Sequence, residues 1–217
     1  MKFITFILLS FVSSLTTNAQ FESNKQVYRA PNLDDVKKDI KTVAVLPFNI
    51  VLSYKKMPKG MTVEMIKEEE EKARTEFQQG LYTYLLRKQE SFTATVQNPD
   101  RTNALLKKAG IKTKDDLEAT LPDSIASILG VDAVIKSNWN YSKTGSEGGA
   151  IARAVLLGGA GSTGSGTLTL QVYNGKDGEL LWRFYKEMNE SIGNDANDTM
   201  ERMMRKLGRN FPLEKEK

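Results

Sequence analysis

The chain has 217 residues and a formal net charge of +4, and it contains neither histidine nor cysteine. The missing imidazole and thiol groups exclude the commonest zinc sites, the serine and cysteine triads and histidine-based proton transfer from this sequence. The basic residues alternate with acidic ones, so no nucleic-acid-binding surface is predicted. Carboxylate, lysine, serine and tyrosine chemistry remains, but no motif indicates it. We therefore expect no catalytic residue, no cofactor and no metal site.

The first 19 residues have the pattern of a secretory signal peptide. Lys2 precedes an apolar run over residues 3–12, and a short polar stretch ends at Ala19. The run is much shorter than the roughly 20 residues of a spanning helix. We expect cleavage between Ala19 and Gln20, followed by export to the periplasm with no membrane span. Because lipid is attached to a cysteine after the signal, we also expect that the protein is not a lipoprotein.

The exported part is expected to form one domain. Residues 20–39 are polar and are interpreted as an extended lead-in, and a single domain follows over residues 40–212, before a charged tail at 213–217. Residues 43–46 form a short apolar, β-branched run that predicts a strand buried on both faces. A long helix is predicted over residues 62–88, with one apolar stripe and a glutamate run opposite it. The stripe consists of Ile66, Ala73, Phe77, Leu81, Tyr84 and Leu85.

The middle of the chain alternates between strands and helices. Residues 91–96 predict a strand, and residues 98–100 predict a turn that caps a helix ending at Gly110. Another helical stretch extends from residue 114 or 115 to Leu129, and Pro122 must start a new segment or kink it. The adjacent acids Asp34-Asp35 and Asp115-Asp116 lie where helices start, so capping is preferred over catalysis for both pairs.

The last part of the chain predicts three strands and a helix. Residues 131–141 predict a strand, and two later runs are separated by the turn sequence NGKDG at 174–178, which is a strong hairpin signal. A final helix is expected over residues 194–211, with a core-facing stripe of Ala196, Met200, Met203, Met204, Leu207 and Phe211. The order of elements predicts an α/β (α+β) fold, with a single mixed sheet of about five strands and helices packed against it.

A glycine-rich insertion is expected over residues 142–166. Gly159 and Gly164 have the spacing of a phosphate loop, but Ser165 and Gly166 follow where lysine and a hydroxyl residue are required. The segment also lacks the alternation of a membrane hairpin. We interpret residues 150–157 as a short apolar clip that packs on its own domain or on a partner. The possible partner contacts are Ile151, Val155, Leu156 and Leu157.

Three stretches of the sequence resemble a broad superfamily of Gram-negative envelope proteins. These stretches are KTVAVLPF, ILGVDAVIKSNWNY and LTLQVYNGKDGELLWRF, which together frame residues 41–186. The superfamily includes the curli-secretion-channel lipoproteins, the penicillin-binding-protein activator lipoproteins and the amino-terminal domain of TolB. The resemblance implies an α/β fold similar to that TolB domain and a role in envelope assembly, secretion or regulation through protein contacts, without enzyme activity. Pore formation is not carried over, because residues 142–166 lack barrel alternation.

Two function classes stay open from the sequence. The first is a periplasmic, non-enzymatic protein that binds another, unidentified envelope protein, in an oligomeric state that the sequence does not determine. The alternative is a small-molecule or glycan-binding protein, or a carboxylate-dependent cell-wall hydrolase. That alternative needs a pocket that holds Trp139, Tyr141 or Trp182 beside convergent acids, whereas the alternation of their strands favours ordinary packing for all three.

Overall fold

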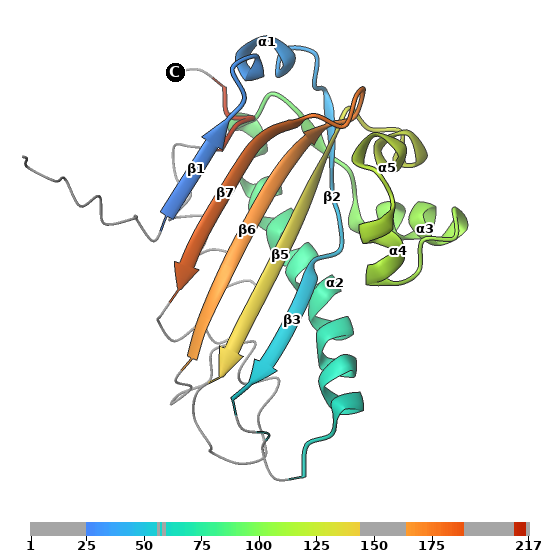
Figure 1. Ribbon diagram of the computed structural model, residues 1–217. Coiled ribbons are helices and arrows are strands. Elements are labelled where there is room, and N and C mark those ends of the chain that lie inside the picture. The colour runs from blue at the N-terminus through green and yellow to red at the C-terminus, as the bar shows by residue number, and fades with distance from the viewer. Residues whose placement is uncertain (1–24, 56, 58–59, 144–163, 189–210, 216–217) are drawn as a thin grey trace, which may run out of the picture.

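A computed structural model describes residues 25–55, 57, 60–143, 164–188 and 211–215 (Figure 1). Seven strands form one mixed sheet in the order β1-β7-β6-β5-β2-β4, and β3 also pairs with β5. The strands are β1 (Lys25–Arg29), β2 (Thr42–Val45), β3 (Asn49–Tyr54), β4 (Thr95–Val96), β5 (Ala133–Lys143), β6 (Gly164–Asn174) and β7 (Leu180–Met188). The α-helices are α1 (Leu33–Val36), α2 (Val63–Arg87), α3 (Pro99–Lys108), α4 (Lys114–Ala119) and α5 (Pro122–Leu129). This arrangement confirms the expected fold class.

The sheet has more strands than the sequence predicted. The expected lead-in at residues 20–39 contributes β1, which pairs antiparallel with β7 at the edge of the sheet. Residues 49–54 form β3, which pairs in parallel with the second half of β5. Conversely, the strand expected over residues 91–96 is only two residues long, at β4. The middle strands therefore match the sequence expectation, and the differences lie at the edges.

Strands β2 and β3 follow one another along β5, with a bulge between them. Val45 pairs with Ile135, whereas Asn49 pairs with Asn138, so three residues on one strand oppose two on the other. The bulge changes which residues face the core, as an extra residue in a strand must. Before it, odd-numbered residues face α2; after it, even-numbered ones do, namely Phe48, Ile50 and Leu52.

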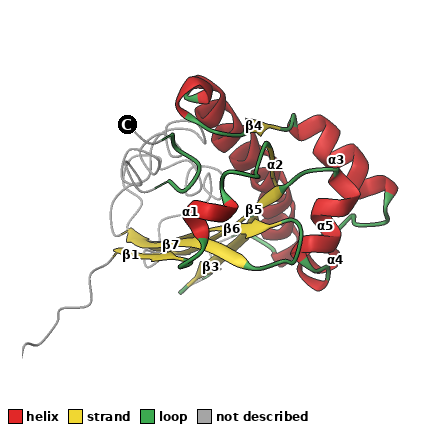
Figure 2. Cartoon of the chain, turned by 90° about the horizontal axis from the view of Figure 1, so that it is seen from above, coloured by secondary structure: helices red, strands yellow, loops and turns green. Residues whose placement is uncertain are grey.

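The long helix α2 covers one face of the sheet, and Figure 2 shows it on the same side as α1. Thr62 caps its start by accepting a hydrogen bond from the backbone N–H of Met65, at 3.3 Å. The predicted apolar stripe is confirmed, because five of its six members are buried and Tyr84 is half-buried. Glu70 is an exception within the glutamate run, since it is buried and accepts the N–H of Leu52 at 2.8 Å.

The three shorter helices α3, α4 and α5 build a second core at the β2 end of the sheet. Asn98 caps α3, as predicted, by accepting a hydrogen bond from the N–H of Asp100 at 2.7 Å. The predicted break at Pro122 is also confirmed, because α4 ends before it and α5 starts there. Both faces of β2 are thereby buried. The second core contains Ala44, Leu46, Leu106, Leu117, Ile125, Ala126, Leu129, Val131 and Val134.

The predicted hairpin is formed by β6 and β7, which pair antiparallel across the turn after Asn174. Leu168, Leu170 and Val172 alternate on the face toward α2 and are fully buried, as expected. Residues 142–143 and 164–166 of the expected insertion continue β5 and β6. The remainder of it, the final helix up to residue 210 and the signal peptide lie outside the described residues. Phe211, the last residue of the expected helix, packs in the core against Phe92 and Trp182. None of the described helices is both long and apolar enough to span a bilayer.

Candidate functional site

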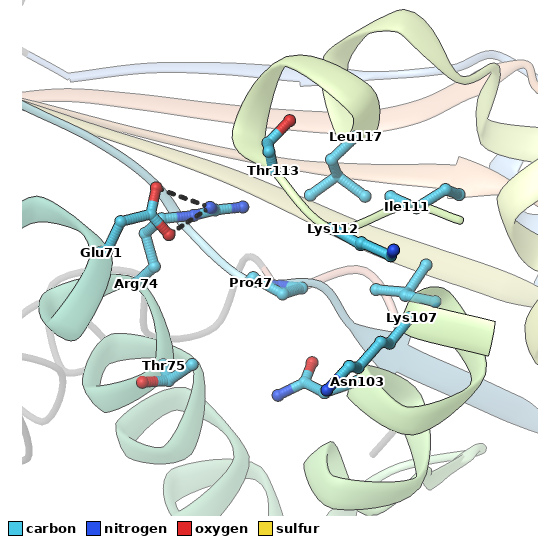
Figure 3. A pocket seen from close by; sticks show the side chains of 11 residues that line it. Pro47, Glu71, Arg74, Thr75, Asn103, Lys107, Ile111, Lys112, Thr113 and Leu117 are labelled. Carbon is cyan, nitrogen blue, oxygen red and sulfur yellow. Dashed lines mark hydrogen bonds and ion pairs between the residues drawn. The ribbon is translucent and has the colours of Figure 1, made fainter. Parts of the chain in front are cut away.

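A recess of about 350 Å³ opens where α2, α3 and α4 meet at the bulge between β2 and β3 (Figure 3). Each of these elements contributes side chains of a different kind. The bulge supplies an apolar ring, α2 supplies an ion pair, and α3 with the following loop supplies cations. The lining consists of Pro47, Glu71, Arg74, Thr75, Asn103, Leu106, Lys107, Ile111, Lys112, Thr113 and Leu117.

The recess lies at the bulge because there the chain leaves the ladder of the sheet. Pro47 has no backbone N–H to donate to a neighbouring strand. Phe48 instead donates its N–H to the carbonyl oxygen of Arg74 in α2, at 3.3 Å. The Arg74 side chain returns the contact, because its Nε donates to the carbonyl oxygen of Phe48 at 3.1 Å. This reciprocal pair fixes α2 against the bulge and buries the arginine.

One edge of the buried Arg74 guanidinium remains open toward the recess. The residue is only 5% exposed. Its Nη1 donates to both carboxylate oxygens of Glu71, at 3.0 and 2.7 Å, and its Nε is occupied by Phe48. The structure gives Nη2 no acceptor among the residues that it describes. In Figure 3 this nitrogen points away from Glu71 and toward Lys112 and Leu117.

A pair of amide side chains joins α2 to α3 beside the recess. Gln78 is fully buried and donates from Nε2 to the carbonyl oxygen of Val45, at 2.7 Å. Gln78 and Asn103 also exchange two hydrogen bonds, at 3.1 and 2.9 Å. Because buried amides must find partners, this pair fixes the distance between the two helices. Asn103 thereby holds the first turns of α3, the helix that also carries Lys107, next to α2.

The loop before α4 is held by a capping box. Asp116 accepts hydrogen bonds from the backbone N–H groups of Lys112 and Thr113, at 3.0 and 2.8 Å, and Thr113 caps the N–H of Asp116 in return. The hydrogen bonds from the backbone of Thr113 and then of Lys112 lower the pKa of Asp116 from its ordinary value. The capping role predicted for Asp115-Asp116 is thus confirmed for Asp116. The box positions both rim residues, Lys112 and Thr113.

The recess carries a net positive charge over an apolar floor. Arg74, Lys107 and Lys112 supply three cations and Glu71 one anion, which leaves +2 among the lining residues. Neither lysine has an ion-pair partner among the residues that the structure describes. In contrast, the nearby Lys114 lies 3.9 Å from a carboxylate oxygen of Glu70. The apolar part of the lining consists of Pro47, Leu106, Ile111 and Leu117.

A second cavity, of about 400 Å³, lies near the start of β2 and the end of β6, and two of its three acidic side chains, Asp132 and Asp177, are occupied by hydrogen bonds. Asp132 accepts from the N–H groups of Lys41 and Thr42 and from the Thr42 hydroxyl, at 2.8 to 2.9 Å. Burial raises the pKa of Asp132, but these hydrogen bonds outweigh it and the pKa is lowered overall. Asp177 is likewise engaged, with Asn174 and the N–H of Glu179. These carboxylates stabilise turns and strand ends.

The residues singled out by the sequence are distributed away from the recess. Trp139 and Trp182 are fully buried and Tyr141 is 3% exposed, all in the core under α2, as the alternation of their strands predicted. The four possible partner contacts, at positions 151 and 155–157, lie outside the described residues. Among the residues that are described, no three His, Cys, Asp or Glu side chains converge as metal ligands.

Sequence reasoning missed the three cations of the recess. Arg74 follows Ala73 and precedes Phe77 by one turn, so it lies on the buried side of α2. A cation beside an apolar stripe is a usable signal, but it does not reveal which elements approach it. Lys107 and Lys112 look like ordinary solvated lysines in the sequence.

Comparison with known proteins yields similar solved structures only. No family model matches the chain, and no curated protein matches it. Lipoprotein GNA1162 from Neisseria meningitidis is 14% identical, with 78% of this chain and 94% of that chain covered and a TM-score of 0.43. The LpoB C-terminal domain from Salmonella enterica is 12% identical, with 69% and 83% covered and a TM-score of 0.33. The PelC dodecamer from Paraburkholderia phytofirmans is 12% identical, with 89% and 98% covered and a TM-score of 0.38.

The resemblance of the sequence to a broad class of envelope proteins stays a prediction. Links to the curli channel and to TolB stay predictions. GNA1162 is called a lipoprotein, whereas the 217 residues here contain no cysteine to carry a lipid. The expectation that this chain is not a lipoprotein stays a prediction, and in this respect the chain would differ from GNA1162.

Proposed function

We propose that this chain is an exported, non-enzymatic protein that binds another protein of the cell envelope and serves assembly, secretion or regulation. The proposed location rests on the signal-like first 19 residues. The proposed binding role is supported chiefly by one observation: a guanidinium that is 95% buried keeps an open edge toward a recess. Glu71 pairs the charge of Arg74, but Nη2 has no acceptor among the described residues, so a ligand that supplies one adds a charge-assisted hydrogen bond.

The size and lining of the recess favour a protein partner. Its volume of about 350 Å³ is near the small end of ligand pockets, which span roughly 300–1,000 Å³. One or two side chains of a partner fill such a space. The apolar floor and cationic rim also match the usual anatomy of a protein interface, in which an apolar centre is surrounded by polar groups.

The chemistry of the recess favours binding over catalysis. Its one carboxylate, Glu71, is held by two hydrogen bonds from Arg74, so its oxygens are not directed at a substrate. A glycosidase needs two carboxylates that face each other across the sugar. Trp139, Tyr141 and Trp182, which that alternative needs in a pocket, are moreover buried under α2. We therefore prefer an adaptor role, the binding of another envelope protein, over the hydrolase alternative.

Crosslinking in the intact envelope tests this proposal. The protein is crosslinked in cells and purified, and whatever is attached to it is identified by mass spectrometry. One reproducible envelope partner supports the proposed role and names the pathway. Capture of no partner, under conditions in which a known envelope complex is recovered, would contradict it and favour a small-molecule ligand.

A further inference from the structure

We propose that the recess between α2, α3 and α4 recognises a carboxylate that is flanked by an apolar residue on a partner protein. This inference rests on the proposed function and specifies the chemistry of the partner. The carboxylate is expected to contact Arg74 Nη2 and the two lysines at the rim, Lys107 and Lys112, while the apolar neighbour packs on the floor.

Arg74 is held in place by the protein before any ligand arrives. Its Nε and Nη1 are fixed by Phe48 and Glu71, so the direction of Nη2 is set by groups within the protein. A donor that is positioned in advance loses little conformational entropy on binding. Hydrogen bonds between guanidinium and carboxylate groups are also among the stronger ones in proteins. The open nitrogen is therefore a ready donor for an anionic oxygen.

The net charge of the residues that line the recess is positive. Glu71 neutralises one of the three cations, and Lys107 and Lys112 leave an excess of +2. An incoming carboxylate reduces this excess of positive charge. A cationic or neutral group offers no such gain, so the electrostatics select an acidic partner.

The floor of the recess is the apolar part of its lining. Leu106 and Leu117 are buried at 3% exposure each, and the half-buried Pro47 and Ile111 complete an apolar surface beside the cations. A free inorganic anion would leave the exposed parts of Pro47 and Ile111 in water, whereas a side chain next to the carboxylate covers them. The combination of charges and apolar surface thus favours a peptide segment over a small anion.

The test uses the purified full chain and short peptides as probes. Acetyl-Leu-Glu-Leu-amide carries a side-chain carboxylate, acetyl-Leu-Gln-Leu free acid carries a terminal one, and acetyl-Leu-Gln-Leu-amide carries none. Binding is followed by NMR on the Arg74 Nε–H and the Ile111 methyl groups. We expect these signals to shift on titration with one or both acids, with a dissociation constant at least fivefold lower than that of the neutral peptide. The binding of the acids should weaken at high salt. Equal binding of all three peptides, or tighter binding of inorganic phosphate, would overturn the proposal.

Charge variants assign the effect to the rim. Lys107→Gln combined with Lys112→Gln should weaken binding of the acidic peptides at least fivefold and leave the neutral peptide unchanged. Lys108→Gln is the matched control, because Lys108 neighbours Lys107 on α3 but does not line the recess. An equal loss in the control would overturn the site. Arg74 is observed and not substituted, since it also holds the bulge at Phe48.

The outcome is separable from that of the crosslinking experiment. Peptide binding is measured on the purified protein and does not depend on capturing a partner. A captured partner whose yield is unchanged in the Lys107→Gln and Lys112→Gln variant would overturn this site while leaving the proposed function intact. Peptide binding without any captured partner would uphold the carboxylate site and contradict the adaptor role.

Discussion

Single side chains at turns and strand ends stabilise this fold through hydrogen bonds to segments that are distant in the sequence. Asp132 is the clearest case, since one carboxylate oxygen accepts three hydrogen bonds from Lys41 and Thr42. Asp132 directly precedes β5, so these hydrogen bonds connect the start of β2 to the start of β5. Because β2 and β5 are neighbours in the sheet, the contact secures a pairing between segments about 90 residues apart.

Asp132→Asn is expected to lower the free energy of unfolding by about 1 kcal/mol at pH 7, since Asp132 is exposed and its charge is screened. The folded pKa is depressed, so the contribution is present above the unfolded value of about 3.9 and is lost as the pH falls through the folded pKa. Urea unfolding at pH 7 and pH 2 measures this. The difference between the two proteins should be smaller at pH 2 than at pH 7, and a difference of the same size at both values would contradict this expectation. Asp39→Asn, in the same cavity, serves as the control.

Gly175 is required because of a close approach of the backbone. A Cβ at this position would lie 2.7 Å from the carbonyl oxygen of Asp132 and 2.8 Å from the Cβ of Ala126. Neither neighbour is the end of a flexible side chain. Gly175→Ala is therefore expected to cost about 1–3 kcal/mol through overpacking. Thermal unfolding checks this against Lys176→Ala, which changes an exposed neighbour, and equal melting temperatures for both variants would refute it.

At the scale of elements, the position of α3 against α2 determines whether the recess exists. The Gln78 and Asn103 side chains make this contact, and Gln78 also binds the carbonyl oxygen of Val45 in β2. Three elements are thus joined at one buried amide. The recess lies directly beside this junction, so its shape depends on it.

A double-mutant cycle on Gln78→Leu and Asn103→Leu tests the junction. The single change at Gln78 should cost about 1–3 kcal/mol, because it leaves the Val45 carbonyl and the Asn103 amide without their partner. The double variant should cost less than the sum, with a coupling of about 0.5–3 kcal/mol. Denaturant unfolding of the four proteins gives the value. Additive costs would show that the amide pair does not couple the helices.

Some elements could be predicted from the sequence, and the reason for each success or failure is physical. The helix α2 and the β6–β7 hairpin show strong periodicity, so their existence and buried faces followed directly. Strand β1 (KQVYR) has four exposed residues out of five, and an edge strand of this kind lacks an apolar alternation. Strand β3 alternates, but its partner β5 is distant in the sequence, and lysines follow it.

The recess could not be predicted because it depends on the tertiary arrangement. Arg74 acquires its role only when the bulge at Pro47 turns the backbone of Phe48 toward α2. Lys107 and Lys112 belong to α3 and the loop after it, and the amide junction holds α3 next to α2. No local pattern encodes the meeting of these elements. The capping role of Asp116 at the start of α4, in contrast, is local and was predicted.

At the scale of the whole molecule, the helices divide into two groups around β2. The long helix α2 covers one face, and α3, α4 and α5 build a second core on the other (Figures 1 and 2). The recess lies where the two groups meet, at the end of the bulge. A partner bound there would contact both groups at once, so binding should stabilise the whole domain.

This stabilisation gives a further expectation for the whole protein. Saturation with the acidic peptide should raise the melting temperature, by an amount that grows with peptide concentration. The neutral peptide, which is expected to bind at least fivefold more weakly, should raise it less at the same concentration. A thermal-shift titration checks the prediction, and an equal shift with both peptides would show that the stabilisation does not come from the cationic rim.

Site-specific photocrosslinking in the intact envelope tests the central claim most directly. A photoreactive residue replaces Thr75, which is exposed and lines the recess, or Thr83, which is exposed on the same helix two turns further on and does not line it. The account predicts one reproducible protein adduct from position 75, lost in the Lys107→Gln and Lys112→Gln variant, and none from position 83. Equal adducts from both positions, or none from position 75 while a known envelope complex is captured, would contradict it.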